Sequence, residues 1–214
     1  EQLYDIGGGV CVFDFNNDGF EDLFLPGGYG MSAFYKNNGN GTFTDVTAQV
    51  LDAQTRILID SLIVTSSVVG DIDNDGDKDI FITTSGFKAN NGVFKQPDLL
   101  LENLGNGTFV NISTAAGITA ITYSEAAAMG DFNMDGFLDI YLSNYVQNMS
   151  QAYDSLGNPI AYLPTCYPNK FYFNNGNKTF TESSADFGLN DAGCALSSVF
   201  TDFDFDNDVD ILLA

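Results

Sequence analysis

The stretch DFNMDGFLD, which occupies residues 131–139, decides the fold. Oxygen-bearing side chains stand at alternate positions from Asp131 to Asp135, Gly136 follows, and Asp139 ends the stretch. Carboxylates this close together repel one another unless a counter-ion neutralises them. A local cation, held by several side chains at once, is the simplest reason for a folded chain to keep this pattern.

The pattern occurs four times along the chain. The other copies are DFNNDGFED at 14–22, DIDNDGDKD at 71–79 and DFDFDNDVD at 202–210, and successive copies start 57, 60 and 71 residues apart. The four copies hold 17 of the 29 acidic residues in a chain of 214 residues, which has 7 basic residues and a formal charge of −22. Recurrence of one motif predicts a repeat architecture, and charge of this sign argues against nucleic acid as a partner.

Each acidic stretch lies between two predicted strands. Short apolar runs precede the copies, and the runs DLFLP, DIFITT, DIYLSN and DILLA follow them. Their length and their Ile, Leu, Phe and Tyr content favour strands. A second block predicts a further hairpin, because its Gly and Asn residues supply the positive φ of tight turns. That block reads FYKNNGNGTFTDV at 34–46, LLLENLGNGTFVNI at 99–112 and KFYFNNGNKTFTES at 170–183.

A unit of four antiparallel strands predicts an all-β fold, namely a β-propeller or partial propeller with three complete blades and one half blade. All blades belong to one repeat domain over 1–214, with blades at about 7–51, 57–118 and 123–189 and the half blade at about 194–214. The insertion at 145–169 interrupts the third blade. Two alternatives stay open for the unfinished end: the chain is part of a longer propeller, or a further copy docks there.

Calcium suits the acidic stretches better than the other common metals. It takes about six to eight oxygen ligands, and positions 1, 3, 5 and 9 offer side chains while position 7 offers a backbone carbonyl. Magnesium wants a stricter octahedron, and zinc or copper would use His or Cys, whereas the chain has no His. The last acid stands at position 9 and leads into a strand, which separates the motif from an EF-hand. An Asx-rich turn without metal is the alternative.

The stretches VFDFNNDGFEDLFLPGG and MGDFNMDGFLDIYLSN, with NNGNGTFTDVT, resemble FG-GAP/VCBS repeats, which form calcium-bearing propeller blades in integrin α-subunits and many bacterial secreted proteins. The resemblance covers nearly the whole chain but departs from the family at the insertion and in the incomplete last blade. It implies extracellular binding, adhesion or scaffolding with about four calcium ions. The matching side chains are Asp14, Asn16, Asp18, Asp22, Asp71, Asp73, Asp75, Asp79, Asp131, Asn133, Asp135, Asp139, Asp202, Asp204, Asp206 and Asp210. Position 7 adds the carbonyls of Phe20, Asp77, Phe137 and Asp208.

Sequons of the form N-x-[ST] predict glycan acceptors if the protein is secreted by a eukaryote. Three of them fall at the same hairpin position, where the same residues also form turns. Asn148, inside the insertion, lacks that explanation. The predicted acceptors are Asn40, Asn106, Asn111, Asn148 and Asn177.

Cysteine usage leaves two interpretations open. Cys11 lies in the first predicted strand and is expected to be a buried thiol. Cys166 and Cys194 could form a disulfide that pins down the insertion, and free buried thiols are the alternative.

An extracellular or cell-surface scaffold for binding or adhesion is the leading functional hypothesis. One alternative is a subunit of an extracellular filament that assembles head-to-tail through the incomplete blade, and another is a carbohydrate-active propeller enzyme such as a polysaccharide lyase. Catalysis is not expected, since the absence of His removes Ser–His and Cys–His dyads, and Glu102, Glu125 and Glu182 are more simply polar surface positions. The expected partners are a protein or glycan ligand or further copies of the chain. Membrane insertion is not expected, because no apolar run approaches about 20 residues.

Overall fold

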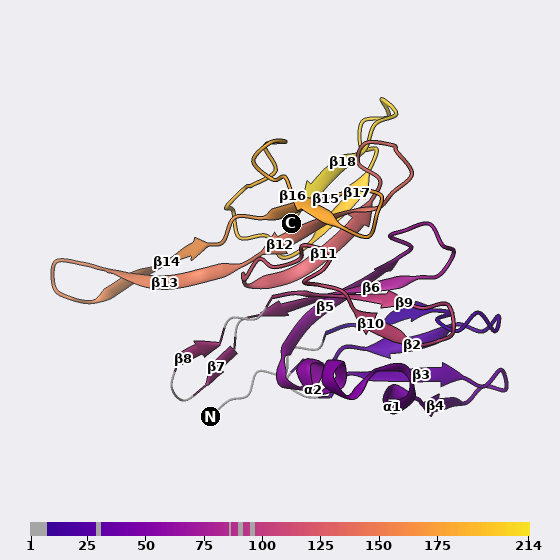
Figure 1. Ribbon diagram of the computed structural model, residues 1–214. Coiled ribbons are helices and arrows are strands. Elements are labelled where there is room, and N and C mark those ends of the chain that lie inside the picture. The colour runs from indigo at the N-terminus through magenta and orange to yellow at the C-terminus, as the bar shows by residue number, and fades with distance from the viewer. Residues whose placement is uncertain (1–7, 29–30, 86, 90–91, 95–96) are drawn as a thin grey trace.

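Sheets stacked one on the next make up the molecule (Figure 1). The structure, a computed structural model, describes residues 8–28, 31–85, 87–89, 92–94 and 97–214. Among the described residues, three sheets have four antiparallel strands and three more have two. The first sheet contains β1 (Cys11–Phe13), β2 (Asp22–Leu25), β3 (Ala33–Asn37) and β4 (Phe43–Asp45). The second contains β5 (Ile63–Gly70), β6 (Asp79–Ser85), β9 (Leu99–Asn103) and β10 (Phe109–Asn111). The third contains β11 (Ser124–Gly130), β12 (Asp139–Asn144), β15 (Lys170–Asn174) and β16 (Phe180–Glu182), and one of the two-stranded sheets pairs β17 (Ser198–Thr201) with β18 (Asp210–Leu213).

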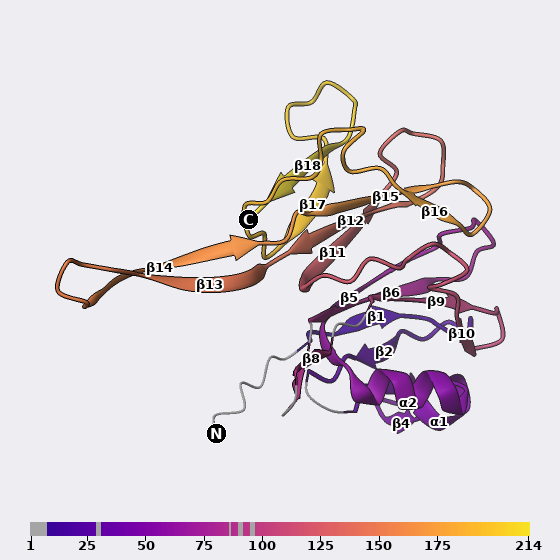
Figure 2. The same cartoon turned by 60° about the vertical axis from the view of Figure 1, so that its left-hand side comes forward.

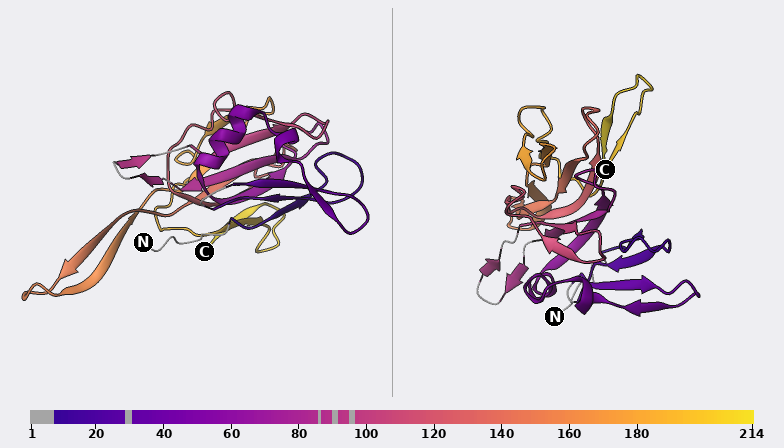
Figure 3. Two further views of the ribbon diagram at one scale, coloured as in Figure 1. Left: turned by 90° about the horizontal axis from the view of Figure 1, so that it is seen from below. Right: turned by 45° about the vertical axis from the view of Figure 1, so that its right-hand side comes forward.

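This arrangement confirms the all-β prediction of three complete four-stranded blades and one half blade. The strands follow chain order across each blade, and the sheets stay separate without closing into a barrel among the described residues. The first strands of successive blades, β1, β5, β11 and β17, contact one another in turn. They therefore form the shared inner edge from which the blades fan outward (Figure 3). The predicted start of blade 1 at residue 7 lies outside the described residues.

In blade 2, alternate side chains along a strand pack against the two neighbouring blades. In β6, Ile80 and Ile82 belong to the hydrophobic cluster shared with blade 1, while Phe81 belongs to the cluster shared with blade 3. In β9, Leu99 and Leu101 face blade 1 and Leu100 faces blade 3 in the same way. Because successive side chains of a strand point to opposite faces, a blade between two neighbours needs apolar residues at every position. Each fully buried side chain of this size contributes roughly 1.5–3 kcal/mol.

Helices lie between blades 1 and 2, where the sequence analysis predicted none. α1 (Thr47–Val50) follows blade 1, and α2 (Ala53–Ser61) precedes β5. Asp52 begins α2 by accepting hydrogen bonds from the N–H groups of Gln54 (2.8 Å) and Thr55 (2.9 Å). Ile59 of α2 is buried in the cluster between blades 1 and 2. Within the described residues, every helix is too short or too polar to span a bilayer.

Two ribbons extend from the links between second and third strands. β7 (Phe87–Ala89) pairs with β8 (Gly92–Phe94) in blade 2, where no ribbon was predicted. In blade 3 the insertion at 145–169 forms a longer ribbon, in which β13 (Val146–Tyr153) pairs with β14 (Pro159–Cys166). We call this ribbon the arm. It projects away from the blades in both views (Figures 1 and 2). Since the acidic stretches link first to second strands, they lie at the opposite end of the blades from the arm.

Polar side chains close the arm end of the blades. The N–H of Thr84 donates to Asp98 Oδ1 (2.8 Å), and the N–H of Asn144 donates to Asn169 Oδ1 (2.8 Å) at the same place in blade 3. The hydroxyl of Ser124 donates to the other oxygen of Asp98 (2.9 Å). Asp98 is 1% exposed, and burial raises the pKa of its carboxyl to about 7. The charged form of Asp98 is therefore disfavoured in the folded protein.

Asp98 should make the stability of the protein fall with rising pH. Its usual pKa is 3.8 and its folded-state pKa is about 7, so the stability it contributes at low pH is lost as the pH rises through that interval. Asp98→Asn keeps the acceptor for Thr84 and removes the charge. We expect this variant to exceed the wild type in free energy of unfolding by about 1–3 kcal/mol at pH 8 and to match it near pH 4.

The reciprocal variant, Asn169→Asp, places the same charge in blade 3 and should introduce a comparable loss at pH 8. Urea unfolding at several pH values and one fixed calcium concentration measures both effects. Parallel pH profiles for Asp98→Asn and the wild type would contradict this interpretation.

Candidate metal centres

The four acidic loops share one backbone conformation. We number them loops 1 to 4, for residues 14–22, 71–79, 131–139 and 202–210, and number the positions in each from 1 to 9. Position 6 has positive φ in every loop, as the pattern predicts: 87° at Gly19, 95° at Gly76, 92° at Gly136 and 74° at Asn207. Position 4 also has positive φ, with 57° at Asn17, 60° at Asn74, 58° at Met134 and 63° at Phe205. Residues such as Met and Phe adopt this region only where their surroundings impose it.

In each loop, backbone N–H groups donate to the carboxylate at position 1, so the loop wraps around this side chain. In loop 3 the N–H of Asp135 donates to Asp131 Oδ1 (3.0 Å) and the N–H of Gly136 donates to Oδ2 (2.8 Å). Asp14 and Asp71 accept the corresponding pairs of N–H groups in loops 1 and 2. In loop 4, Asp202 Oδ2 accepts from the N–H of Asn207 (3.2 Å). Hydrogen bonds to a carboxylate are among the stronger ones, so the loop shape depends on this anion.

The carboxylate at position 5 tightens the second half of each loop. In every loop it accepts a hydrogen bond from the N–H of position 7. The four bonds are Phe20 to Asp18 (3.1 Å), Asp77 to Asp75 (2.9 Å), Phe137 to Asp135 (2.9 Å) and Asp208 to Asp206 (3.1 Å). The predicted ligand residues at positions 1, 5 and 7 therefore belong to one small hydrogen-bonded turn.

The carboxylate at position 9 joins the loop to the third strand of its blade. Asp139 accepts from the N–H of Phe132 in the loop (3.0 Å) and from the N–H of Asn174 at the end of β15 (2.8 Å). Asp22 and Asp79 make the same two kinds of contact in blades 1 and 2. These three acids are at most 1% exposed. Burial raises the pKa of Asp79 to about 7 and also raises the pKa of Asp22 and Asp139.

Oxygen atoms from several positions converge in the loops. One oxygen each of Asp71, Asp73 and Asp79 lies within 4.8 Å of the others in loop 2, and Asp202, Asp204 and Asp210 form the same cluster in loop 4. Loops 1 and 3 carry Asn at position 3 in place of the second Asp of these clusters. Carboxylate and amide oxygens this close could hold a hard divalent cation.

Three of the predicted ligand atoms are buried without a hydrogen-bond partner among the described residues. One, Asp73 Oδ2 in loop 2, has an ion pair with Lys178 (2.5 Å), and the other two have no such contact in the described part of the chain. Those two are Asn16 Oδ1, at position 3 of loop 1, and Asp202 Oδ1, at position 1 of loop 4. An unpaired buried acceptor costs about 1–3 kcal/mol. A cation in the loop would satisfy each of them, so the donor set fits calcium.

Lysine side chains supply positive charge to loops 1 and 2. Lys36 Nζ lies 2.6 Å from Asp18 Oδ2, and its hydrogen bond holds the pKa of Asp18 below the usual value. Lys178, on the hairpin of blade 3, lies 2.5 Å from Asp73 Oδ2 and 2.5 Å from Glu102 Oε1. The contact of Lys178 also crosses from blade 3 to blade 2. These partly exposed ammonium groups compensate single carboxylates and leave most of the acidic charge unpaired.

A buried asparagine ties each of loops 1 and 2 to the next blade along the chain. The amide of Asn174 donates to the carbonyl of Ile72 in loop 2 (2.8 Å) and to that of Leu138 in its own blade (3.0 Å). The amide of Asn103 likewise reaches the carbonyl of Phe15 in loop 1 (2.9 Å). Sequence analysis missed these residues, although their place in the repeated hairpin block (Asn37, Asn103 and Asn174) was visible.

Direct bonds between loops add to this connection. The amide of Asn17 donates to the side chain of Asp77 in the next loop, and the amide of Asn74 donates to the carbonyl of Gly136 (2.8 Å). Position 4 therefore links successive loops in blades 1 to 3. Met134 and Phe205 cannot form this bond, since their side chains carry no donor.

The predicted glycan acceptors occupy two kinds of site. Asn40, Asn106 and Asn177 each accept from the N–H and hydroxyl of the Thr two residues on, and Asn111 does the same with Ser113. These four side chains thus shape turns. Asn148 instead lies exposed on β13 of the arm.

A disulfide holds the base of the arm. Cys166, the last residue of β14, is bonded to Cys194 in the segment before β17, with their Cα atoms 5.1 Å apart. Cross-linking a loop of this length stabilises a fold by roughly 3–4 kcal/mol. Cys11 is a buried free thiol beside Ser67, and burial raises its pKa.

Comparison with known proteins agrees with the repeat pattern. Residues 14–82, which span loops 1 and 2, match the family model described as FG-GAP-like repeat. The resemblance to FG-GAP repeats is therefore confirmed, and this part of the chain carries such a repeat. Cartilage acidic protein 1 of Xenopus tropicalis is 31% identical over 136 residues, which make up 55% of this chain and 20% of that protein. The chain thus spans only a small part of this relative.

Among solved structures, a lectin of Agrocybe aegerita described as recognising non-reducing terminal N-acetylglucosamine is similar at 15% identity. The TM-score is 0.39, and the match covers 95% of this chain and 56% of the lectin chain. So low a score supports no conclusion about this protein.

Removing the inter-blade asparagine should destabilise the stack. We expect Asn174→Ala and Asn103→Ala each to lower the free energy of unfolding by about 2–4 kcal/mol, because they leave buried carbonyls without donors. Asn37→Ala is the matched control, since the Asn37 amide donates only to Glu21 within blade 1 (3.0 Å). Urea unfolding measures the three losses. If the control loses as much as the other two variants, the inter-blade bond is not the stabilising contact.

Proposed function

We propose that the four acidic loops bind calcium and that the chain is a calcium-stabilised extracellular β-propeller scaffold for binding or adhesion. The observation that carries the proposal is the convergence of three carboxylate oxygens within 4.8 Å in each of loops 2 and 4. Three anions at that distance destabilise the folded state unless a cation joins them. The unpaired acceptors Asn16 Oδ1 and Asp202 Oδ1 support the same assignment in loops 1 and 4.

Calcium fits this donor set because all of it is oxygen and its arrangement is irregular. Calcium accepts variable numbers of oxygen ligands, whereas magnesium demands a near-ideal octahedron. Positions 1, 3, 5 and 9 would supply side-chain oxygens and position 7 a carbonyl. When bound, the ion would neutralise the loop and replace repulsion between carboxylates with shared coordination.

The loops are placed where metal binding would strengthen the joints between blades. Loop 2 receives the side chain of Asn174 from blade 3, and loop 1 receives that of Asn103 from blade 2. A cation that fixes a loop therefore also fixes the acceptor for the next blade. Calcium would act as a structural element of the scaffold.

An extracellular location suits this proposal. Extracellular modules bind calcium at about 10⁻⁴–10⁻³ M, in keeping with the calcium available outside cells. Disulfides such as Cys166–Cys194 persist in oxidising compartments. The similar protein from Xenopus tropicalis is named for cartilage and for its acidity, and this chain is itself acidic, with a formal charge of −22. The expected ligand is a protein or a glycan.

Chelation should destabilise the fold. A ligand present at a hundred times its Kd stabilises the folded state by about 2.7 kcal/mol per site, so removing several ions should lower the Tm markedly. Thermal unfolding with calcium, with EGTA and with calcium restored measures the effect. Asp135→Ala should reduce the calcium response, and Asp154→Ala, which removes an acid from the tip of the arm, should leave it unchanged. Identical melting curves with and without EGTA would refute calcium binding.

Asn148 should carry a glycan before the hairpin asparagines do, if a eukaryotic cell secretes the protein. Its side chain is exposed on the arm, whereas Asn40, Asn106 and Asn177 are engaged in turns. Peptide mass spectrometry of the secreted protein gives the occupancy of each site. Occupied hairpin sites beside a bare Asn148 would contradict the expected order.

A further inference from the structure

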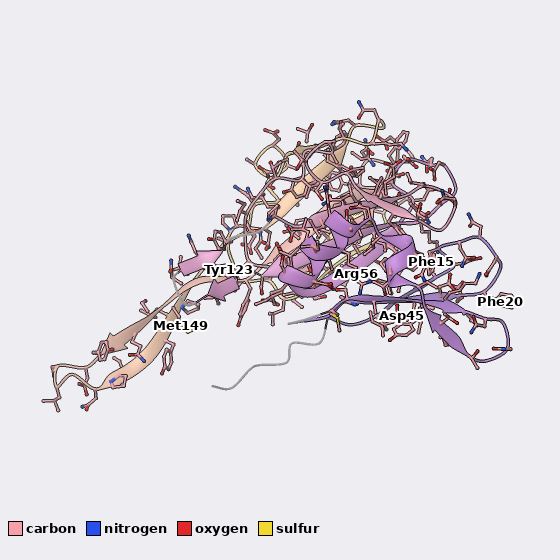
Figure 4. The ribbon with its side chains drawn as sticks, turned by 60° about the horizontal axis from the view of Figure 1, so that its bottom comes forward. Phe15, Phe20, Asp45, Arg56, Tyr123 and Met149 are labelled. Atoms are coloured by element: carbon pink, nitrogen blue, oxygen red, sulfur yellow. A yellow bond between two sulfur atoms is a disulfide. The ribbon has the colours of Figure 1, made fainter. Side chains whose placement is uncertain are left out.

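The arm differs in charge from the rest of the molecule. Residues 146–166 contain one charged side chain, Asp154, in a chain whose formal charge is −22. Met149 on the arm and Phe20 in loop 1 lie at opposite ends of the molecule (Figure 4). The acidic loops and the nearly uncharged ribbon are therefore separated by the length of the blades.

The two edges of the arm are unequal. β13 and β14 form a sheet of their own, so each has one edge without a strand partner in that sheet. Pro159 begins β14 and Pro164 lies within it, opposite Met149. Proline is tolerated in a strand where its nitrogen faces away from the ladder. The outer edge of β14 is thus blocked, while β13 has neither proline nor charge, the usual protections of an edge strand.

The register of the ribbon shows which groups the open edge presents. Since Pro164 faces outward and pairs with Met149, the backbone N–H and carbonyl of Met149 face away from β14 as well. Alternation places the same groups of Gln151 and Tyr153 outward. Met149 and Tyr153 thus lie two residues before and two residues after Gln151.

One face of the ribbon is apolar and exposed. Cross-strand partners share a face, so Met149, Gln151 and Tyr153 lie on the same face as Tyr162, which pairs with Gln151. Met149 is 58% exposed, Tyr153 57% and Tyr162 65%. The hydroxyl of Tyr153 donates to Gln151 Oε1 (2.6 Å), which agrees with a common face.

We propose that two copies of the chain pair through their β13 edges. An antiparallel pairing about a two-fold axis at Gln151 matches Gln151 with its own copy and Met149 with Tyr153. The two ribbons then form one four-stranded sheet, whose apolar face gathers the exposed Met and Tyr side chains of both copies. Because the prolines block each β14 edge, the assembly stops at the dimer and does not extend into a fibre.

The charge of the chain favours a second copy as the partner of the β13 edge. Two chains that each carry a formal charge of −22 repel each other wherever their acidic surfaces meet. The arm, which has one charged side chain, can approach a second copy with little repulsion. Antiparallel arms place the two bodies at opposite ends of the joint sheet. The arm starts at Val146, five residues before Gln151, so the two arm bases are about ten residues apart at about 3.3 Å each, roughly 33 Å. That exceeds the Debye length of about 8 Å at physiological ionic strength.

The proposal is independent of calcium binding and compatible with a glycan. The side chain of Asn148 lies on the face opposite Met149 and Gln151, since neighbouring strand residues alternate. A sugar there leaves the β13 edge and the apolar face open.

Gln151→Pro tests the pairing directly. It removes both central inter-chain hydrogen bonds, because Gln151 pairs with its own copy, and leaves the β13–β14 ladder intact, because the Gln151 nitrogen faces outward. Sedimentation or light scattering over a concentration series, in calcium, should show wild type at twice the chain mass of 23.1 kDa. We expect Gln151→Pro to weaken the dimer by about tenfold or more.

Charge variants give a second, fold-preserving test. Gln151→Lys and Gln151→Glu should each dimerise less than the wild type, and an equimolar mixture should recover a heterodimer, because opposite charges meet at the axis. Leu163→Lys adds the same charge to β14 on the other face and should remain dimeric. A wild-type chain that stays monomeric throughout the series overturns the proposal. So does a dimer that tolerates Gln151→Pro, or a mixture that shows no recovery.

Discussion

The structure depends on the buried carboxylate that ends the acidic loop of each complete blade. Asp139 receives the N–H of Phe132 in its loop and the N–H of Asn174 in the third strand, so one anion holds the loop, the second strand and the third strand together. The side-chain amide of Asn174 in turn donates a hydrogen bond to the carbonyl of Ile72 in the preceding blade. Burying an anion is costly unless donors surround it. Here backbone N–H groups, placed in the same way in each repeat, donate to the carboxylate and offset that cost. The blade and the joint between blades therefore rest on the same few residues.

This constraint explains how charge is distributed. Acids are concentrated in turns that hold their own shape through carboxylate hydrogen bonds, and those turns all fall at one end of the blades because each links a first strand to a second strand. Among the described residues, the opposite end carries one fully buried acid, Asp98, and the arm, whose two strands have no charged side chain. The molecule thus has one end suited to cations and another suited to an apolar contact.

Much of this architecture could be predicted from the sequence, because the acidic loop and the hairpin block recur in phase with apolar strands. Position 6 of the loop was predictable from its Gly and Asn residues. Position 4 was not, since Met134 and Phe205 adopt positive φ only under tertiary constraint. The inter-blade hydrogen bonds of Asn103 and Asn174 could not be predicted. Both residues resemble the neighbouring turn asparagines, and their partners lie in another blade. The helix α2 escaped notice because a nine-residue segment gives a weak periodic signal, although Asp52 followed by Thr55 is a helix-start pattern.

The acidic loops are proposed to be metal sites rather than turns that merely contain acids. Equilibrium dialysis of the purified chain against about 10 mM free calcium, well above the roughly 10⁻⁴–10⁻³ M at which extracellular modules bind, counts the ions directly. Binding of about four calcium ions per chain is the predicted result. A chain that retains no calcium above the level expected for diffuse attraction to its charge would contradict it.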